Sequence, residues 1–340
     1  MHAADLESVA RSLVAPGKGI LAADESTPTI EKRFRTIGVE SAEETRRAYR
    51  ELLFATEGIS DFISGVILFD ETIRQADRGG TPFPQLLARQ GVIPGIKVDR
   101  GAKPLAGFPG EKVTEGLDGL RDRLEEYAEI GARFAKWRAV IDIGEGIPTE
   151  GCIAANAHAL ARYAALCQEA GMVPIVEPEV LMDGAHPISR CEEVTARALA
   201  RVYEALREQR VRLEGTLLKP NMVLPGKKCP HQVPVEEIAK ATLRCLRRTV
   251  PAAVPGIVFL SGGQSPEEAT ERLNAMNAMG KAPWELSFSY GRALQEPVLA
   301  AWKGDAGNVP AARKAFYHRS RCNGAARYGK YTRAMETETA

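Results

Sequence analysis

The sequence predicts an α/β protein built as a single (β/α)8 barrel of the TIM type. Short β-rich runs alternate with longer helical segments along the whole chain, and no linker, charge block or low-complexity tract divides it. Barrels of alternating strands and helices reach this length, 340 residues, as one domain. We therefore expect one barrel domain over residues 1–340, with a short N-terminal helical extension and a short C-terminal tail at about 332–340.

Eight runs have the length and composition of strands. In chain order they are Gly19–Asp24, Ser64–Phe69, Ile93–Asp99, Phe134–Ile141, Val173–Val180, Glu214–Lys219, Ile257–Leu260 and Leu286–Tyr290. Segments rich in helix-forming residues lie between them, among them Leu117–Ile130, Ile153–Ala170, Val194–Glu208 and Pro234–Arg247. Because a helix follows each strand, we expect a parallel sheet. A closed barrel is favoured over a doubly wound open sheet, which has the same alternation.

The overall composition excludes several classes of protein. Lys and Arg number 45 against 44 Asp and Glu, so no general charge excess favours nucleic acid or an anionic membrane. The six cysteines are widely spaced without a C-x-x-C pair, which argues against both a disulfide framework and a thiolate zinc site. Asp5 and Glu7 stand where a secretory leader needs basic residues. We expect a cytoplasmic protein that acts on small molecules and binds neither nucleic acid nor membrane.

Charged residues inside apolar strands indicate where the chemistry lies. Lys136 and Arg138 are two residues apart on one predicted strand, so both side chains point to the same face. Glu177 and Glu179 repeat this spacing on the next strand, and Lys219 ends another. A single charge of this kind usually reaches from a strand end into water. Several strands sharing the pattern suggest that these side chains meet at the mouth of the barrel, where active sites of this fold lie.

Two further strands end in charged residues, Asp24 and Lys97. We expect a cluster with shifted pKa values formed by Asp24, Lys136, Glu177, Glu179 and Lys219. A lysine is a nucleophile only when neutral, and a nearby ammonium such as that of Lys136 favours the neutral form of Lys219. The carboxylates can carry the protons that carbinolamine formation and dehydration require. These residue types fit iminium chemistry.

Glycine-rich turns follow the last two predicted strands, at Ser261–Ser265 and Ser289–Arg292. Backbone N–H groups there can approach an oxyanion, and barrels often bind phosphate in these loops. Ser26, Thr29, Arg33 and Lys97 offer hydroxyls and cations for a second anion. Alternatively, the Thr27–Pro28 segment begins a helix and leaves Arg33 solvated. The histidines have no metal-binding spacing, so we expect neither a metal ion nor a cofactor.

Seven segments closely resemble class I fructose-bisphosphate aldolase, and the match runs from about Leu6 to about Tyr331. They are Ala15–Thr27, Gly95–Asp99, Phe134–Arg138, Val176–Glu179, Gly215–Asn221, Leu260–Ser265 and Ser287–Leu294. The resemblance implies reversible, metal-independent cleavage of fructose 1,6-bisphosphate to dihydroxyacetone phosphate and glyceraldehyde 3-phosphate, in glycolysis and gluconeogenesis. It also implies a homotetramer.

The resemblance assigns a role to each charged residue of the cluster. Lys219 matches the lysine that forms the Schiff base, and Glu177 matches the general acid and base of carbinolamine turnover. Lys136 resembles the cationic partner, Asp24 the base that takes the C4 hydroxyl proton, and Glu179 a residue that orients them. The C1 phosphate end would contact Ser261, Gly262, Gly263, Ser289, Gly291 and Arg292. The C6 phosphate end would face Arg33, Lys97 and Arg138, with Ser26 and Thr29 nearby.

The sequence departs from the family pattern in two places. Many relatives end in a tyrosine that assists proton transfer at C3 of the enamine, and this sequence ends in Thr339-Ala340. We expect another group or water to carry that proton, or the step to be slow. Pro28 replaces a usual glycine and stiffens a loop near the predicted C6 phosphate site, while Thr29 keeps a hydroxyl there.

Two other functions compete with this interpretation. A transaldolase-like or deoxyribose-phosphate aldolase-like enzyme would share the lysine but need only one phosphate site. A scaffold protein would keep the barrel without needing Asp24, Lys136, Glu177 and Lys219 together.

Overall fold

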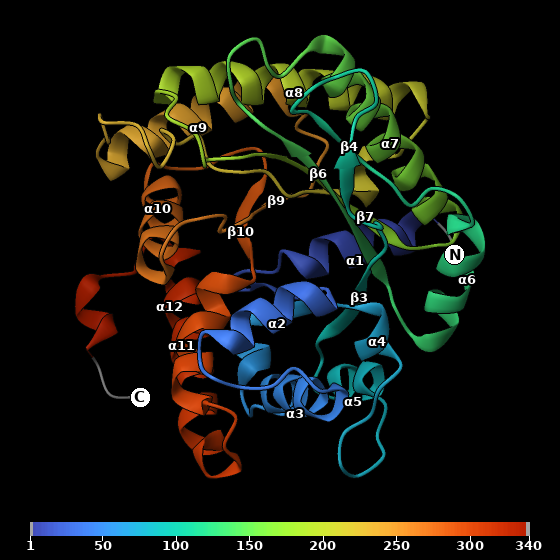
Figure 1. Ribbon diagram of the computed structural model, residues 1–340, viewed down its shortest axis with the longest axis vertical. Coiled ribbons are helices and arrows are strands. Elements are labelled where there is room, and N and C mark those ends of the chain that lie inside the picture. The colour runs from blue at the N-terminus through green and yellow to red at the C-terminus, as the bar shows by residue number, and fades with distance from the viewer. Residues whose placement is uncertain (1–2, 338–340) are drawn as a thin grey trace.

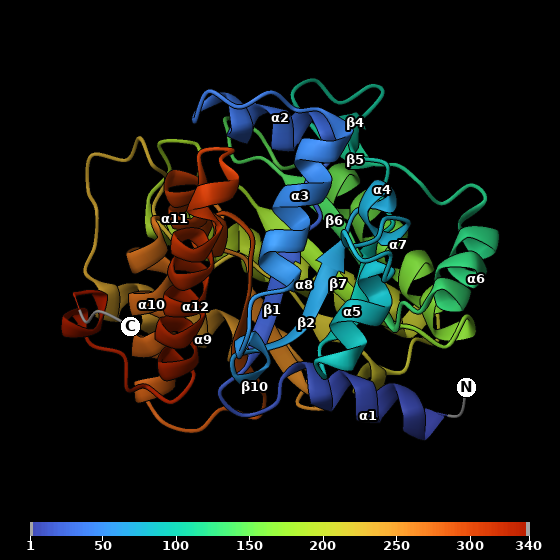
Figure 2. The same ribbon diagram turned by 90° about the horizontal axis from the view of Figure 1, so that it is seen from below.

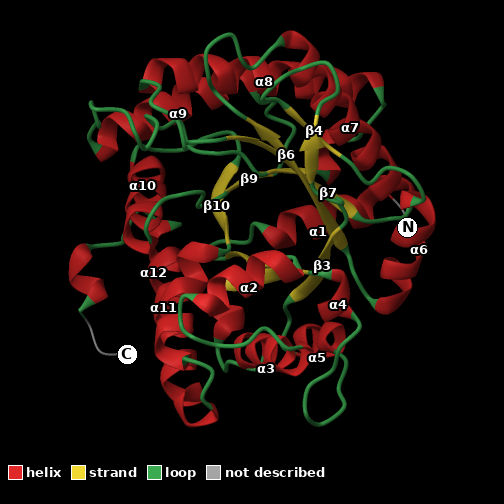
Figure 3. Cartoon of the chain, viewed as in Figure 1, coloured by secondary structure: helices red, strands yellow, loops and turns green. Residues whose placement is uncertain are grey.

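In the computed structural model, which describes residues 3–337, eight parallel strands form a closed barrel (Figures 1 and 3). Around the barrel the strand order is β1-β10-β9-β8-β7-β6-β3-β2. The strands are β1 (Gly19–Ala23), β2 (Ile63–Leu68), β3 (Ile93–Lys97), β6 (Phe134–Ile141), β7 (Val173–Val180), β8 (Leu217–Leu218), β9 (Gly256–Phe259) and β10 (Glu285–Tyr290). This closure confirms the predicted barrel and excludes the doubly wound sheet.

Helices surround the barrel on all sides in Figure 3. They are α1 (Ala3–Leu13), α2 (Thr27–Arg35), α3 (Glu43–Phe54), α4 (Asp70–Ile73), α5 (Phe83–Arg89), α6 (Leu120–Ile130), α7 (Glu150–Glu169), α8 (Ile188–Glu208), α9 (Val235–Thr249), α10 (Pro266–Ala278), α11 (Arg292–Trp302) and α12 (Val309–Ala326). Short 3-10 turns are η1 (Ile59–Asp61), η2 (Leu213–Gly215), η3 (Ala306–Asn308) and η4 (Arg333–Glu336). None of the helices in the described part of the chain has the length and apolar content that crossing a membrane requires.

Several predicted boundaries were wrong, among them Leu117 for the start of α6, which begins at Leu120, and Asp99 for the end of β3, which ends at Lys97. The predicted strand Glu214–Lys219 begins with η2, and only Leu217–Leu218 pairs as β8. Helix α7 begins at Glu150 rather than at Ile153, because the Thr149 hydroxyl caps it by accepting the Cys152 N–H at 3.2 Å. Helix α8 likewise begins earlier than predicted, at Ile188.

A small antiparallel hairpin was not predicted. It consists of β4 (Ala102–Pro104) and β5 (Lys112–Thr114), which pair only with each other. Each strand has three residues, too few for the alternation of apolar and polar side chains to be recognised. The hairpin follows β3 and lies at the same end of the barrel as α2 (Figure 2).

Helix α1 lies across the opposite end of the barrel (Figure 2). Its apolar face, with Leu6, Ala10 and Leu13, forms one buried cluster with Phe134 and other inward-facing residues near the starts of the strands. Gly95 makes room there, since a Cβ on this residue would lie 2.3 Å from the Phe134 ring. The amino-terminal end of the barrel is therefore a packed floor.

Along β6 and β7 the inward-facing residues change from apolar to charged. On β6 they run from Phe134 to Lys136 and Arg138, and on β7 from Ile175 to Glu177 and Glu179. The outward-facing positions pack under the helices, as when Trp137 contacts Tyr163 with ring centroids 5.6 Å apart. The fold thus places an apolar floor at one end and a charged mouth at the other.

Candidate active site

A cavity of about 550 Å³ opens at the carboxyl ends of the strands. Every site residue predicted from the sequence lines it. These are Asp24, Ser26, Thr29, Arg33, Lys97, Lys136, Arg138, Glu177, Glu179, Lys219, Ser261, Gly262, Gly263, Ser289, Gly291 and Arg292. They come from β3, β6, β7 and β10 and from the segments that follow β1, β8, β9 and β10. The structure therefore brings the whole predicted set to one place, while the individual roles stay predictions.

Lys136 lies at the centre of the charged cluster. Its ammonium is 2.7 Å from the Asp24 carboxylate, 3.4 Å from Glu177 and 4.0 Å from Asp99. The side chain is 4% exposed, so these interactions are little screened by water. One buried cation thereby holds three carboxylates, one on β7 and two just after β1 and β3, within reach of the same space.

Lys219 is connected to this cluster through Glu177. One oxygen of Glu177 lies 3.3 Å from the Lys219 ammonium, and the other faces Lys136. The Lys219 backbone N–H donates to the Val176 carbonyl at 2.8 Å, which fixes the residue just beyond the end of β8. Glu177 is therefore placed to exchange a proton with a group attached to Lys219.

The charges of the cluster shift pKa values in opposite directions. Burial alone would raise the pKa of Asp24, but the ammonium groups of Lys136 and Lys219 outweigh it and hold that pKa well below its usual range. Burial alone would lower the pKa of Lys136, but Asp24, Glu177 and Asp99 outweigh it and hold that pKa well above its usual range. Asp24 is thus kept as a carboxylate and Lys136 as an ammonium.

Two further ion pairs border the cavity beside the cluster. Arg138 pairs with Glu179, and Lys97 pairs with Asp99 at 2.7 Å. The Asp99 carboxylate also accepts the backbone N–H of Arg138 at 3.2 Å. Asp99 was not predicted as a site residue, although its spacing of two from Lys97 already implied a shared face. Its burial and its contacts add it to the site.

The glycine-rich turn after β9 faces Arg292. The Arg292 guanidinium donates to the Gly262 carbonyl at 3.0 Å and to the Gln264 carbonyl at 3.4 Å, so it lies against the turn. The Ser289 hydroxyl is buried on β10 without a hydrogen-bond partner among the described residues. An unsatisfied buried hydroxyl in a cavity wall is suited to a polar ligand atom. Helix α10, capped by Ser265, starts directly after this turn.

Arg33 is held by a buried carboxylate rather than solvated. It pairs with Glu25, which also accepts from Arg50 at 2.7 Å and from Gln295 at 2.8 Å. The turn at Thr27–Pro28 does begin helix α2, as the alternative interpretation proposed, but Arg33 nevertheless faces the cavity. One of its terminal nitrogens lies 3.7 Å from the position that a Cβ on Gly291 would take. Arg33 therefore lies beside a residue predicted for the other phosphate.

Lys227 lines the cavity and was missed by the sequence analysis. Its backbone N–H donates to the Met182 carbonyl at 2.7 Å, so the segments after β7 and β8 are joined there. Its ammonium lies over Gly263, where a Cβ would come within 2.1 Å of it. The only ion pair found for it within residues 3–337 is with exposed Asp183, at 3.6 Å. No strand pattern marks such a loop residue.

The chain is similar to known proteins over nearly its whole length. The sequence profile of the family "Fructose-bisphosphate aldolase class-I" matches residues 5–340. The "Probable fructose-bisphosphate aldolase class 1" of Xanthomonas axonopodis pv. citri is 60% identical over 97% of this chain and 99% of that protein. The fructose-bisphosphate aldolase of Dictyostelium discoideum is 55% identical over 99% of this chain and 95% of its own length.

A solved structure agrees with these sequence matches. The fructose-bisphosphate aldolase of Plasmodium falciparum, in a complex with TRAP and a small-molecule inhibitor, superimposes with a TM-score of 0.96 at 52% sequence identity. The alignment covers 97% of this chain and 95% of that one.

Proposed function

Since this chain belongs to the class I fructose-bisphosphate aldolases, we propose that Lys219 is the lysine that forms the Schiff base with the sugar. The enzyme reversibly cleaves fructose 1,6-bisphosphate to dihydroxyacetone phosphate and glyceraldehyde 3-phosphate. The observation that best supports this role for Lys219 is the continuous line of contacts from Lys219 through Glu177 and Lys136 to Asp24.

The first step forms the iminium. The Lys219 amine attacks the C2 ketone, and the resulting carbinolamine loses its hydroxyl as water. Glu177, 3.3 Å from the Lys219 nitrogen, donates the proton that the departing hydroxyl needs. Lys136, fixed as a cation on the other oxygen of Glu177, stabilises the carboxylate that remains.

The second step breaks the bond between C3 and C4. Asp24, kept ionised by Lys136, takes the proton from the C4 hydroxyl, and the new carbonyl at C4 leaves as the aldehyde. The electron pair of the broken bond moves to C3 and is delocalised into the iminium as an enamine. A proton then adds to C3, and water hydrolyses the iminium through Glu177 in reverse.

The phosphates occupy the two sides of the cavity. Ser261, Gly262, Gly263, Ser289, Gly291 and Arg292 bind the C1 phosphate, and the unsatisfied Ser289 hydroxyl supports this placement. The C6 end faces Lys97 and Arg138, with Ser26 and Thr29 nearby. Arg33 lies beside Gly291, so its guanidinium is placed to contact either phosphate. Lys227, over Gly263, adds a cation to the C1 side.

Glu179 acts as a positioning residue and takes no part in the proton transfers. It pairs with Arg138 at the cavity wall, while Glu177 is the residue that contacts both lysines. We therefore assign Glu179 the task of holding Arg138 toward the substrate.

We further propose a cytoplasmic homotetramer. A relative from Arabidopsis thaliana, 59% identical over 93% of this chain, is named cytosolic. The tetramer rests on the family resemblance. Sedimentation velocity should give the mass of four chains, and a stable monomer would contradict the proposal.

Removal of metal ions tests the class of mechanism. Cleavage of fructose 1,6-bisphosphate should proceed at the same rate with and without a chelator, because lysine chemistry supplies the electron sink in place of a metal. The assay couples the aldehyde product to a hydride-transfer enzyme that needs no metal. Loss of activity that returns on adding a divalent metal would contradict a lysine-based mechanism.

A further inference from the structure

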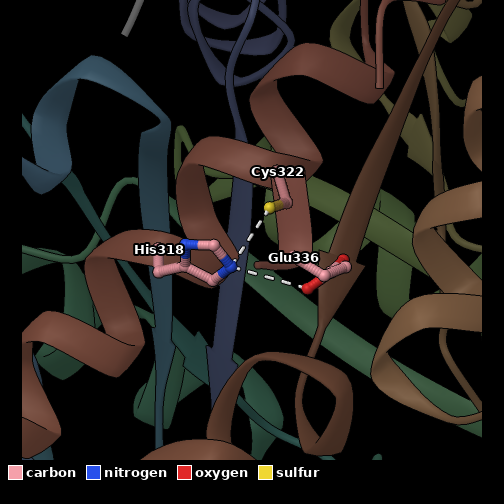
Figure 4. A group of neighbouring side chains, drawn as sticks. All are labelled: His318, Cys322 and Glu336. Carbon is pink, nitrogen blue, oxygen red and sulfur yellow. Dashed lines mark hydrogen bonds and ion pairs between the residues drawn. The ribbon is translucent and has the colours of Figure 1, made fainter. Parts of the chain in front are cut away.

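Three metal-ligating side chains gather outside the barrel mouth, where the C-terminal turn meets α12. His318 and Cys322 lie one helical turn apart on α12, and Glu336 reaches them from η4 (Figure 4). The imidazole nitrogen, the thiol sulfur and a carboxylate oxygen all lie within 4.8 Å of one another. No spacing in the sequence predicts this group, because His318 and Cys322 alone form no complete ligand motif and Glu336 belongs to the expected tail.

Two of the three distances in this group match those between ligands of one zinc ion. The His318 Nε2 atom is 3.6 Å from the Cys322 sulfur and 3.5 Å from the Glu336 carboxylate. A tetrahedral Zn²⁺ ion with bonds of about 2.3 Å to sulfur and about 2.0–2.1 Å to nitrogen and oxygen separates its ligands by roughly 3.3–3.6 Å. The ion would therefore need little movement of His318 relative to Cys322 and Glu336, whose own ligand atoms lie within 4.8 Å of each other.

The carboxylate is held in place by a second layer of contacts. The Arg319 guanidinium donates to Glu336 at 2.5 Å, and the Tyr331 hydroxyl donates to it at 2.7 Å. Metal-binding carboxylates are commonly oriented by such outer hydrogen bonds. A thiolate and a carboxylate also supply two negative charges to match those of the ion. The site has three protein ligands, and Arg319 adds a positive charge nearby. For both reasons we expect weaker metal binding than at a site with four protein ligands.

We propose that His318, Cys322 and Glu336 bind one zinc ion, with water in the fourth position, and that the ion fastens η4 to α12. The site lies apart from the cavity residues and takes no part in the cleavage. Arg319 links it to α10, since this side chain also donates to the Pro266 carbonyl at 3.1 Å and to the Thr270 hydroxyl at 2.6 Å. Those residues form the start of the helix that follows the turn at Gly262 and Gly263.

Titration with Co²⁺ in place of zinc tests this site. The full-length enzyme, freed of metal with a chelator and then desalted, should bind one Co²⁺ per chain and show a sulfur-to-cobalt charge-transfer band. Zn²⁺ should displace it. Cys322→Ser should abolish the band, and His318→Gln, which alters a partly exposed side chain, should weaken binding at least tenfold. The matched control Cys245→Ser replaces a buried cysteine whose thiol lies 3.9 Å from a backbone carbonyl, and it should leave the titration unchanged.

A separate measurement covers the case in which Cys322→Ser fails to fold. Zn²⁺ should raise the melting temperature of the wild type and of Cys245→Ser by the same amount, and that of His318→Gln by clearly less. No binding near one equivalent, or a charge-transfer band that persists in His318→Gln with unchanged affinity, would overturn the proposal. Cleavage activity is not the readout, so this result is independent of the aldolase mechanism.

Discussion

At the residue scale, the site depends on two lysines with different surroundings. Lys136 contacts carboxylates from three strand ends and is held as a cation, whereas Lys219 contacts Glu177 alone among the carboxylates of the described residues. A permanently charged lysine cannot be the nucleophile, but it can stabilise the carboxylates around it. This difference in contacts is why Lys219, and not Lys136, is assigned to the Schiff base.

The contribution of the ion pair between Asp24 and Lys136 to the stability of the fold should be lost at very low and at very high pH. The lowered pKa of Asp24 means that its contribution to stability is present above the unfolded value, about 3.9, and is lost as pH falls through the folded value. The raised pKa of Lys136 means that its contribution is present below about 10.4 and is lost as pH rises through the folded value.

A double-mutant cycle with Asp24→Asn and Lys136→Met measures this coupling by urea unfolding. The coupling free energy should stay constant from about pH 5 to about pH 9 and decline on either side. A coupling that titrates near neutral pH would show that one of the two groups is not held in its charged form.

Lys227 should contribute to binding of the C1 phosphate. Lys227→Gln removes the ammonium over Gly263, so we expect KM for fructose 1,6-bisphosphate to rise by roughly threefold to tenfold, with little change in kcat. The neighbouring Lys228→Gln is the matched control, since it removes the same charge from an exposed residue that is absent from the cavity wall. An equal rise in KM for the two substitutions would mean that Lys227 attracts the anionic substrate only over long range and does not bind its phosphate directly.

At the element scale, β6 and β7 each have an apolar half and a charged half. Helix α1 covers the apolar end, and Leu13 lies fully buried there against β2 and β6. The apolar cluster under α1 and the surrounding helices stabilise the barrel without help from the charged side chains at the mouth. Many charged groups can therefore be placed close together there.

Truncation of a floor residue tests this division. Leu13→Ala should lower the free energy of unfolding by about 2–5 kcal/mol through lost burial and a cavity, while kcat at low temperature stays near the wild-type value. Arg11→Ala, on the exposed face of the same helix, should change stability by less than about 0.5 kcal/mol. A loss of kcat in folded Leu13→Ala would show that the floor and the mouth are coupled.

Strand periodicity explains which parts of the site were predictable. Lys136, Arg138, Glu177 and Glu179 could be placed on one face because alternation in a strand fixes direction from sequence alone. Lys227 could not, since its position depends on hydrogen bonds between two loops that no local pattern encodes.

The short elements were not predicted from the sequence for a similar reason. Strand β8 has two residues, and its neighbours Leu213–Gly215 turn instead of extending. The expected tail at 332–340 contains η4, which is held through Glu336 by contacts with α12. Residues 338–340 of that tail, like residues 1–2 of the N-terminal extension, lie outside the described part of the chain.

At the scale of the whole molecule, one closed barrel gathers residues that are more than 260 positions apart in the chain. Asp24 on the first strand's end and Arg292 after the last line the same cavity because β1 pairs with β10. Lys97 on β3 and the turn after β9 line opposite sides of the same cavity, so a substrate that contacts both must span the mouth, as a sugar with a phosphate at each end does. This geometry favours the bisphosphate substrate over the single-phosphate substrates of the competing lysine enzymes.

The most direct test of the mechanism is borohydride reduction of the enzyme mixed with dihydroxyacetone phosphate and a chelator, followed by intact mass measurement and peptide mapping. We predict one stable adduct per chain, located on Lys219 and absent from Lys219→Ala. An adduct on a different lysine, or none from an enzyme that still cleaves fructose 1,6-bisphosphate, would contradict the assignment of Lys219.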